Sequence, residues 1–393
     1  MTLSFPPLPS WSAALVATFV GFGGTIALVV QALRAMGATV DQTGSAVTAL
    51  CLGIAFAGAA LSFRHRMPVV LAWSTPGAAL LAATSTGISW PAAIAVFVTA
   101  AVMMIIVGVT PALGRLIARI PAAIASAMLA GVLLPFCLAL FRLGSTDPVL
   151  VASLVVVFLA ARRLIPLYAL IVVLALAIGF TLVRGDMAQL AAGPTFGTLL
   201  PIAPQPDIAS IISLGIPLFM VTLVSQNLPG LVVLRSAGYQ PPAGTLIATT
   251  GLASLIAAPF GAHGVNIAAI TASLCTSAEA HPDPARRWQV AMIYAGFYLA
   301  LALFSPALVR LFLALPPPVI ASVTGLALIP PLIGALENAM SDPRDRDPAI
   351  VTFLATGSGV VLFGLGSAFW GLIAGAVALG LKRLFEKRAA PAN

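Results

Sequence analysis

Two stretches of the chain place helix-breaking and polar residues inside long apolar sequence, and they hold the side chains best suited to bind a small ligand. One stretch covers residues 67–77 and the other covers residues 258–267. Proline removes a backbone donor and clashes with the preceding helical turn, while glycine loosens the backbone, so neither stretch can continue a helix. In the second stretch we expect a new helix to begin near Gly264.

The apolar segments that follow these breaks are too short to cross a bilayer. One ends near Thr84 and the other near Ala278, whereas about 20 helical residues are needed to cross roughly 30 Å of hydrocarbon. The breaks should therefore lie within the membrane, where irregular backbone is tolerated only if protein or a water-filled cavity satisfies its polar groups. Paired short, interrupted segments of this kind are typical of a transporter's binding site.

Anion binding is the chemistry that these breaks could perform. Each half-helix would begin with free N–H groups and a partial positive charge, so two of them converging on one cavity would hold a carboxylate. The residues that we assign to the site are Ser74, Thr75, Gly77 and Ala78 on one side, Gly264, Val265 and Asn266 on the other, and Trp73 and His263 at the flanks. The alternative is that both stretches are packing breaks whose backbone groups are satisfied internally.

A third polar cluster, at residues 225–230, contains the amides Gln226 and Asn227. Amides in hydrocarbon are costly unless they are partnered. These two side chains could bind the substrate directly, or they could brace the broken stretches by interhelical hydrogen bonds. The glycine-rich residues 21–24 occupy the corresponding region of the first apolar segment, where we expect close helix approach, with ligand contact as the alternative.

Few ionisable groups are placed to carry a coupling proton. His263 is the only one that we expect near the middle of the membrane, and an imidazole titrates in the range that suits proton uptake. Its alternative role is that of a neutral, hydrogen-bonded histidine in a packed break. Glu279 and His281 close the tenth apolar segment at the cytoplasmic side, where they could relay protons or belong to a solvated loop.

The composition is that of an integral membrane protein. Of 393 residues, 60% are hydrophobic and 8% are charged, and the mean hydropathy is +1.09. The apolar runs leave no room for a soluble catalytic domain, and no enzyme or nucleotide-binding motif is present. The three cysteines stand far apart, which predicts neither disulfides nor a metal site. The net charge of +8 comes from arginines scattered over short loops, so it indicates topology rather than nucleic-acid binding.

We expect an all-α membrane protein with about fourteen spans. The expected spans are residues 11–33, 44–63, 69–84, 90–109, 121–141, 148–161, 167–183, 208–234, 243–260, 264–278, 288–308, 317–336, 349–363 and 367–384. Residues 349–384 could instead form one kinked span, which leaves twelve or thirteen spans open. With both termini in the cytoplasm, fifteen of the nineteen Lys and Arg residues lie on the cytoplasmic side, as the positive-inside rule requires.

Short phrases recur in the same order about 200 residues apart, which indicates an internal duplication. The matching pairs are 33–37 with 234–238, 110–116 with 305–311, 124–126 with 320–322, and 147–151 with 347–351. The repeats would be residues 1–190 and 206–393, with seven spans each. An odd number inverts the second half, so the third and tenth spans should meet head to head near the midplane.

The motifs at Ala72–Ala79, Leu223–Gly230 and Asn266–Ala272 resemble those of the BenE family of benzoate/proton symporters. The similarity continues through Glu279–Asp283 and Ser367–Gly375 and covers nearly the whole chain. The resemblance implies a secondary transporter of the bacterial inner membrane that carries a small aromatic carboxylate with protons and needs no cofactor. It also implies a fold related to that of nucleobase and ascorbate transporters.

In that fold a core domain moves against a gate domain. The resemblance implies a core of spans 1–4 and 8–11 (about 11–110 and 208–308) and a gate of spans 5–7 and 12–14 (about 121–184 and 317–385), with homodimers formed through the gate. Nucleobase relatives bind substrate with acidic residues where this chain has Gln226 and Val265. The change removes carboxylates that would repel an anion, and with them the obvious proton carrier.

The hypothesis from the sequence is therefore an elevator-like, proton-coupled carrier of benzoate or a similar acid. Helix dipoles and Asn266 would hold the carboxylate, while Trp73 and aliphatic neighbours would hold the ring. A carrier of nucleobases or other small anions and an uncoupled channel remain as alternatives. A membrane-embedded enzyme or scaffold is disfavoured, because no nucleophile, metal cluster or acid pair is present.

Overall fold

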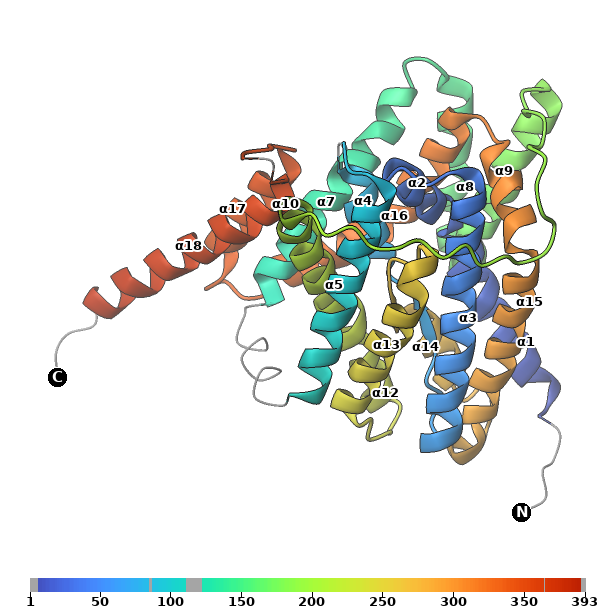
Figure 1. Ribbon diagram of the computed structural model, residues 1–393, viewed down its shortest axis with the longest axis horizontal. Helices are drawn as coiled ribbons and strands as arrows, with labels where there is room; N and C mark the ends of the chain where they lie inside the picture. The colour runs from blue at the N-terminus through green and yellow to red at the C-terminus, as the bar shows by residue number, and fades with distance from the viewer. Residues whose placement is uncertain (1–5, 85–86, 111–121, 364, 390–393) are drawn as a thin grey trace.

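The computed structural model describes residues 6–84, 87–110, 122–363 and 365–389, and over these ranges the chain is predominantly helical (Figure 1). The helices are α1 (Leu8–Thr18), α2 (Ile26–Ala35), α3 (Val40–His65), α4 (Thr75–Ala83), α5 (Trp90–Val109), α7 (Ala122–Leu143), α8 (Pro148–Leu164), α9 (Ala169–Arg184), α10 (Ile208–Ser210), α11 (Ile216–Thr222), α12 (Leu228–Ser236), α13 (Ala243–Ala257), α14 (Ile270–Thr276), α15 (Trp288–Leu313), α16 (Pro317–Met340), α17 (Arg346–Gly357) and α18 (Ser367–Ala389). Most of the predicted repeat phrase at 110–116, and Arg115 and Arg119, lie outside the described residues.

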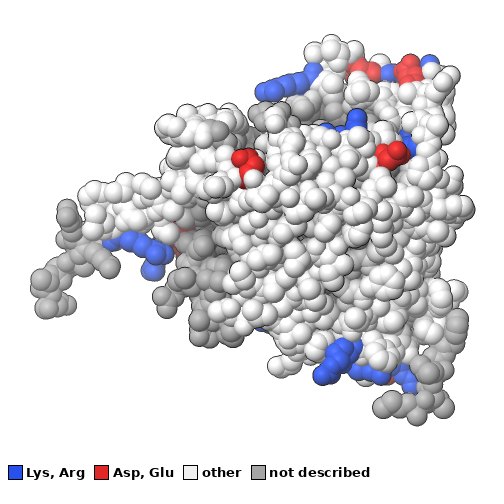
Figure 2. Space-filling model, in the orientation of Figure 1, with Lys and Arg blue, Asp and Glu red and all other residues white. Residues whose placement is uncertain are grey.

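Nine helical segments of the described chain are long and apolar enough to cross a membrane. On the face shown in Figure 2, charged side chains of the main body gather toward its two opposite ends, and the band between them is almost uncharged. This distribution suits a protein that spans a bilayer. The remaining helices are shorter: α4 has nine residues and α14 has seven.

The first and eighth expected spans are long helices interrupted by π-helical turns. Turn η1 (Phe19–Gly23) separates α1 from α2, while η3 (Ile211–Gly215) and η4 (Leu223–Asn227) interrupt the helix that runs from α10 to α12. A π turn inserts a residue into the helical ladder and is frequent at functional sites. The glycine-rich cluster and the Gln226–Asn227 pair both fall on such turns.

The two breaks pair with each other as a short antiparallel ladder. Strand β1 (Leu71–Trp73) lies beside β2 (Val265–Ile267), with Ala72 opposite Asn266 at its centre. Two further bonds extend the pairing, from Ser74 N to Gly264 O (3.3 Å) and from Ala268 N to Val70 O (3.0 Å). The expectation that a helix begins near Gly264 is wrong, because the chain first satisfies its backbone by strand pairing and α14 begins only at Ile270.

Side chains from three helices satisfy the outer edges of this ladder. The Ser254 hydroxyl accepts from Val265 N (2.8 Å) and donates to Val265 O (3.1 Å). The Asn227 Oδ1 accepts from Ile267 N (2.9 Å), and Tyr294 OH donates to Leu71 O (3.0 Å). Because a buried backbone group without a partner is costly in hydrocarbon, these side chains are what allow strands to exist at this depth.

Helices α3 and α15 pack along each other on one side of the ladder, and α5 and α13 pack together on another. A second group contains α7, α8, α9 and α16, which share a hydrophobic cluster around Leu140, Phe158, Val173 and Leu326. Helices α17 and α18 are separate elements packed against each other, and α18 points away from the main body in Figure 1.

Ser254 should therefore be a stability determinant of the ladder. Ser254→Ala leaves the N–H and the carbonyl of Val265 buried and unpaired, so we expect a loss of about 1–3 kcal/mol in the free energy of unfolding and a lower thermal midpoint in detergent. Ser273→Ala is the matched control, because that exposed hydroxyl only bonds its own helix at Ile270 O. Equal midpoints for the two variants would contradict the bracing role.

Candidate functional site

The polar residues after β1 form the start of α4. Ser74 is fully buried and caps this helix, since its Oγ accepts from Gly77 N (3.1 Å) and shares a 2.8 Å hydrogen bond with Thr222 Oγ1. The Ala78 amide already bonds Ser74 O (2.8 Å), and Pro76 has no N–H. Only the Thr75 amide is left without an acceptor in this part of the described chain. We had expected the Gly77 and Ala78 amides to be free, and the structure contradicts this.

The residues predicted on the opposite side do not form a helix N-terminus. Gly264 O accepts from Ser74 N, both backbone groups of Val265 bond Ser254, and Asn266 pairs with Ala72. That part of the prediction is wrong, because the ladder uses the groups that a helix start would have left free. The second half-helix starts five residues after Val265, at Ile270, and no side chain caps it.

His263 and Asn266 are both buried beside the ladder. His263 Nε2 lies 3.1 Å from Ser74 O and donates to it, so the imidazole links β2 to the cap of α4. Asn266 Nδ2 donates to the carbonyl of its own neighbour, Ile267 (3.2 Å). Among the described residues, neither His263 Nδ1 nor Asn266 Oδ1 has a hydrogen-bond partner, so each presents one open acceptor.

Aromatic side chains gather at the Trp73 end of β1. The Trp73 ring lies 5.2 Å from the Phe22 ring and 6.4 Å from the Tyr298 ring, and the Tyr298 and Tyr294 rings contact each other in a tilted arrangement with 4.7 Å between centroids. The indole N–H of Trp73 donates to Thr25 Oγ1 (2.7 Å), which fixes the orientation of the ring. We call Phe22, Trp73, Tyr294 and Tyr298 the aromatic cluster.

The π turn of the first long helix, the start of α14 and helix α15 converge at Gly21. A Cβ added to Gly21 would lie 3.1 Å from Tyr298 OH and 3.2 Å from Thr271 Cγ2, so glycine allows the three elements to approach closely here. Thr271 and Tyr298 are at most 5% exposed, and their hydroxyls lie beside the Tyr294 hydroxyl but make no hydrogen bond of good geometry among the described residues. The nearby Tyr294 hydroxyl already donates to Leu71 O.

The start of α14 therefore combines two hydroxyls that lack well-aligned partners among the described residues with uncapped backbone N–H groups, directly beside aromatic rings. Buried donors without acceptors are costly, and a carboxylate would supply the missing acceptors. Sequence reasoning did not assign Thr25, Thr271, Tyr294 or Tyr298 to the site. One signal was available: two of the chain's four tyrosines, Tyr294 and Tyr298, are four residues apart and so share one face of an apolar helix.

The other predicted residues lie elsewhere or have another role. Asn227 braces β2, while Gln226 is half-buried on the same π turn. Glu279 is exposed, and His281 is buried in the loop after α14. In that loop Arg287 donates to Thr276 O (2.7 Å) and His281 O (2.8 Å), so it binds the end of α14 opposite the aromatic cluster.

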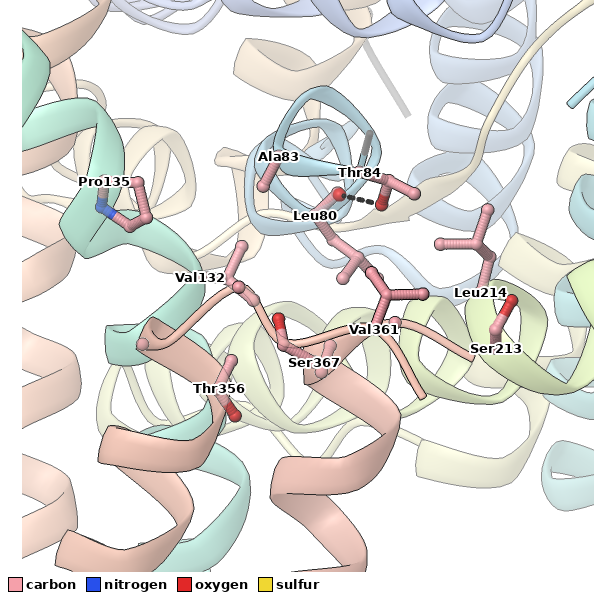
Figure 3. A pocket seen from close by; sticks show the side chains of 14 residues that line it. Leu80, Ala83, Thr84, Val132, Pro135, Ser213, Leu214, Thr356, Val361 and Ser367 are labelled. Carbon is pink, nitrogen blue, oxygen red and sulfur yellow. Dashed lines mark hydrogen bonds between the residues drawn. The ribbon is translucent and has the colours of Figure 1, made fainter. Parts of the chain in front are cut away.

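A cavity of about 70 Å³ lies at the other end of α4 (Figure 3). Leu80, Ala83 and Thr84 of α4 face Val132 and Pro135 of α7 across it, and Thr356 and Ser367 of the α17–α18 pair close it. It is distinct from the point where Gly21, Thr271 and Tyr298 converge. It marks incomplete packing between α4, α7 and the α17–α18 pair.

Comparison with solved structures shows the fold. The transmembrane domain of the cyanobacterial bicarbonate transporter BicA matches with a TM-score of 0.56 at 13% identity, over 96% of both chains. Murine Slc26a9, an anion transporter in its inward-facing state, matches with a TM-score of 0.62 at 12% identity, over 98% of this chain and 70% of the other. The chain shares the fold of these membrane transporters.

Comparison of sequences shows the family. The profile of the family described as benzoate membrane transport protein, BenE, matches residues 5–381. The inner membrane protein YdcO of Escherichia coli is 40% identical over 98% of both chains. The benzoate membrane transport protein of Acinetobacter baylyi is 36% identical over 93% of both. The chain is thus a membrane transporter rather than an enzyme, and it belongs to the BenE family of benzoate membrane transport proteins.

Proposed function

We propose that this protein carries benzoate, or a similar small aromatic carboxylate, and binds it between Gly21, the start of α14 and the aromatic cluster. The observation that carries the proposal is the pair of buried hydroxyls of Thr271 and Tyr298 beside Trp73, neither of which has a well-aligned hydrogen bond among the described residues. The name of the relative from Acinetobacter baylyi supports the substrate. No side chain with a formal charge is among the residues that form this point.

In this proposal the carboxylate accepts hydrogen bonds from the Thr271 and Tyr298 hydroxyls and from the free N–H groups that begin α14. Such bonds to a charged group are stronger than bonds between neutral groups. The ring of the substrate packs against Phe22 and Trp73, whose apolar faces exclude water. Ser74, Asn227 and Asn266 then act by holding α4 and the ladder in place rather than by dominating the binding energy.

We also propose the predicted inverted repeat, with seven segments in each half. The nine long segments and the shorter helices α4, α8, α9, α14 and α17 together make fourteen. Antiparallel pairing of β1 with β2 about Ala72 and Asn266 is what a twofold axis in the membrane plane would produce. Both termini would then be cytoplasmic, in the inner membrane that the name of the relative from Escherichia coli indicates.

Two local structures support the duplication. Arg34–Gly37 and Arg235–Gly238 end their helices alike, with glycine φ values of +91° and +88° and matching bonds from Ala38 N to Leu33 O and from Tyr239 N to Leu234 O. The matched aspartates also pair alike. Asp147 bonds Arg184 across α8 and α9, and Asp347 bonds Lys382 across α17 and α18.

Substrate can reach the proposed site only if helices move, because the surrounding side chains are buried. We propose the core and gate division, with the core formed by α1–α5 and α10–α15 and the gate by α7–α9 and α16–α18. The separate hydrophobic cluster of α7, α8, α9 and α16 supports a gate that holds together on its own. The apolar side chains that α18 exposes, such as Ile373 and Val377, would suit a homodimer through the gate.

In this proposal His263 carries the coupling proton. His263 could take a proton on its open Nδ1 while Nε2 keeps its bond to Ser74 O. Because that bond joins the imidazole to the cap of α4, protonation of His263 would act directly on a helix of the core. Glu279 and His281 lie at the opposite end of α14, and the role that we propose for them is to pass protons between His263 and the cytoplasm.

Uptake by proteoliposomes tests the substrate. We expect radiolabelled benzoate to accumulate when an inward proton gradient is imposed, and accumulation to fall when the gradient is abolished. Bicarbonate and nucleobases should compete poorly, because neither offers a benzoate-like ring and carboxylate together. Uptake of bicarbonate with no uptake of benzoate would favour the second candidate, a small-anion carrier, which the likeness to BicA keeps open.

The binding site itself is tested by removing one hydroxyl at a time. Tyr298→Phe and Thr271→Val keep the side-chain shapes but each lose a hydrogen bond to a charged group, about 1.5–3 kcal/mol, so benzoate affinity should fall about ten- to a hundredfold. Tyr239→Phe is the control, since that hydroxyl bonds Pro284 O in a loop. Titration calorimetry on the purified protein measures all three, and unchanged affinity in both site variants would refute the assignment.

His263→Gln separates proton uptake from positioning. A glutamine amide can replace the Nε2 donor to Ser74 O but cannot accept a proton near neutral pH. We expect this variant to exchange benzoate across the membrane yet fail to accumulate it under a proton gradient, whereas His263→Ala should lose both. Gradient-driven accumulation by His263→Gln would exclude His263 as the proton carrier.

A further inference from the structure

A long extended segment connects the two halves of the chain and crosses the outside of the helices around the ladder. In Figure 1 it runs as a thin line from the end of α9 to α10. We infer that residues 188–205 are a strap that travels with the core, and that the chain bends at residues 185–187 when the core moves against the gate. The inference rests on the core and gate movement proposed above. We call residues 188–205 the strap.

Among the described residues, the hydrogen bonds from strap backbone N–H groups to the helices go to the core or to Ala314, the residue that follows α15. The bonds join Ala188 N to Ala314 O (3.0 Å), Gly197 N to Leu303 O (2.7 Å), Leu200 N to Ser45 Oγ (2.9 Å), Ile202 N to Pro259 O (2.8 Å) and Gln205 N to Pro91 O (3.0 Å). The acceptors belong to α3, to the first turn of α5, to the break after α13, and to α15 and the residue that follows it. Five anchors over this length leave the strap little freedom relative to these elements.

Two of the anchors supply donors that the broken helix needs. Turn η5 (Ala258–Phe260) ends α13, and its last carbonyls have no continuing helix to bond them. Ile202 N donates to the Pro259 carbonyl. The Ser45 hydroxyl donates to the Phe260 carbonyl (3.1 Å) and accepts from Leu200 N. The strap is therefore bonded to the break that leads into β2.

Side-chain contacts also hold the strap against α15, which belongs to the core. The Phe196 ring lies 5.9 Å from the Phe304 ring, and Arg310 donates to Pro194 O. Gly197 lies flat on the helix, since a Cβ there would come within 2.5 Å of Ala302 O. The close approach requires glycine and holds the strap against α15 along several residues.

The gate end of the connection is anchored separately. Arg184, the last residue of α9, bonds Asp147 at the start of α8, and this bond holds the pKa of the Asp147 carboxyl below its usual range, so the pair stays charged at neutral pH. Only residues 185–187 separate this gate anchor from the first core anchor at Ala188. Gly185, at φ +70°, closes α9 as its C-cap, with bonds from Gly185 N to Leu182 O (3.3 Å) and from Asp186 N to Thr181 O (3.2 Å), so the change of direction falls between this cap and Ala188.

Crosslinking tests the strap. Ala188→Cys with Ala314→Cys joins two residues whose backbones are already bonded, and Phe196→Cys with Phe304→Cys, joined by a short bismaleimide, pins the strap at a second place. Benzoate uptake by proteoliposomes is measured before and after each crosslink is formed. We expect both crosslinked proteins to keep their uptake rates within about twofold, because a strap that travels with α15 loses no needed motion.

The contrasting pair joins core to gate. Gly24→Cys with Leu170→Cys would place the two Cβ atoms about 3.7 Å apart, a separation that a disulfide spans. Because the new Cβ at residue 24 would also lie 2.7 Å from Val20 O, the backbone must shift there, and the reduced double variant is the reference for uptake. This disulfide should reduce uptake at least about tenfold, reversed by reduction, since it prevents the proposed movement. If the strap crosslinks also stop uptake, the strap must move relative to α15 and the inference is wrong.

The remaining outcomes separate the inference from the proposed function. If the core–gate disulfide leaves uptake intact, the proposed movement is wrong, and the hinge at residues 185–187 falls with it. If the protein without crosslinks takes up no benzoate but does take up another anion, only the proposed substrate is wrong. The crosslinks are then read with that anion in the same way.

Discussion

The structure depends on one constraint, which is that an unpaired backbone N–H or carbonyl is costly in the interior of a membrane protein. Two helices break in the interior of this protein, and the backbone groups that the breaks leave unbonded pair with each other as β1 and β2. The edges that remain are satisfied by Ser254, Asn227 and Tyr294 from three further helices. The ladder thus fixes the positions of α4, α13, α14 and α15 together.

The pairing of buried polar groups also indicates where a ligand binds. Around the ladder most polar groups are paired, including the cap of α4, which Ser74 and Thr222 complete. The start of α14 is different, because it lacks a side-chain cap and because the hydroxyls of Thr271, in its first turn, and of nearby Tyr298 have no well-aligned partner among the described residues. With Phe22 and Trp73 alongside, this point offers donors to a carboxylate and an apolar surface to a ring. Family membership and local geometry therefore lead to the same class of substrate.

The breaks and the apolar helices could be predicted from the sequence because proline, glycine and hydropathy act locally. The pairing of the breaks as strands could not, since Val265 and Ile267 take their partners from segments far away in the chain. For the same reason α14 begins at Ile270 rather than near Gly264. The alternative predicted role of Asn227, as a brace, agrees with its bond to Ile267 N. Thr271 and Tyr298 were missed because the sequence of an apolar helix does not show which of its hydroxyls lack partners.

The central claim is that the substrate lies between Gly21, the start of α14 and the aromatic cluster, and a structure determined with bound benzoate tests it most directly. The account predicts density for the ring against Phe22 and Trp73, and for the carboxylate within hydrogen-bonding distance of the Thr271 and Tyr298 hydroxyls. Density in the cavity between α4, α7 and the α17–α18 pair, with the aromatic cluster empty, would contradict it. In that case the hydroxyls of Thr271 and Tyr298 would need another explanation, and the binding site would lie between α4, α7 and the α17–α18 pair.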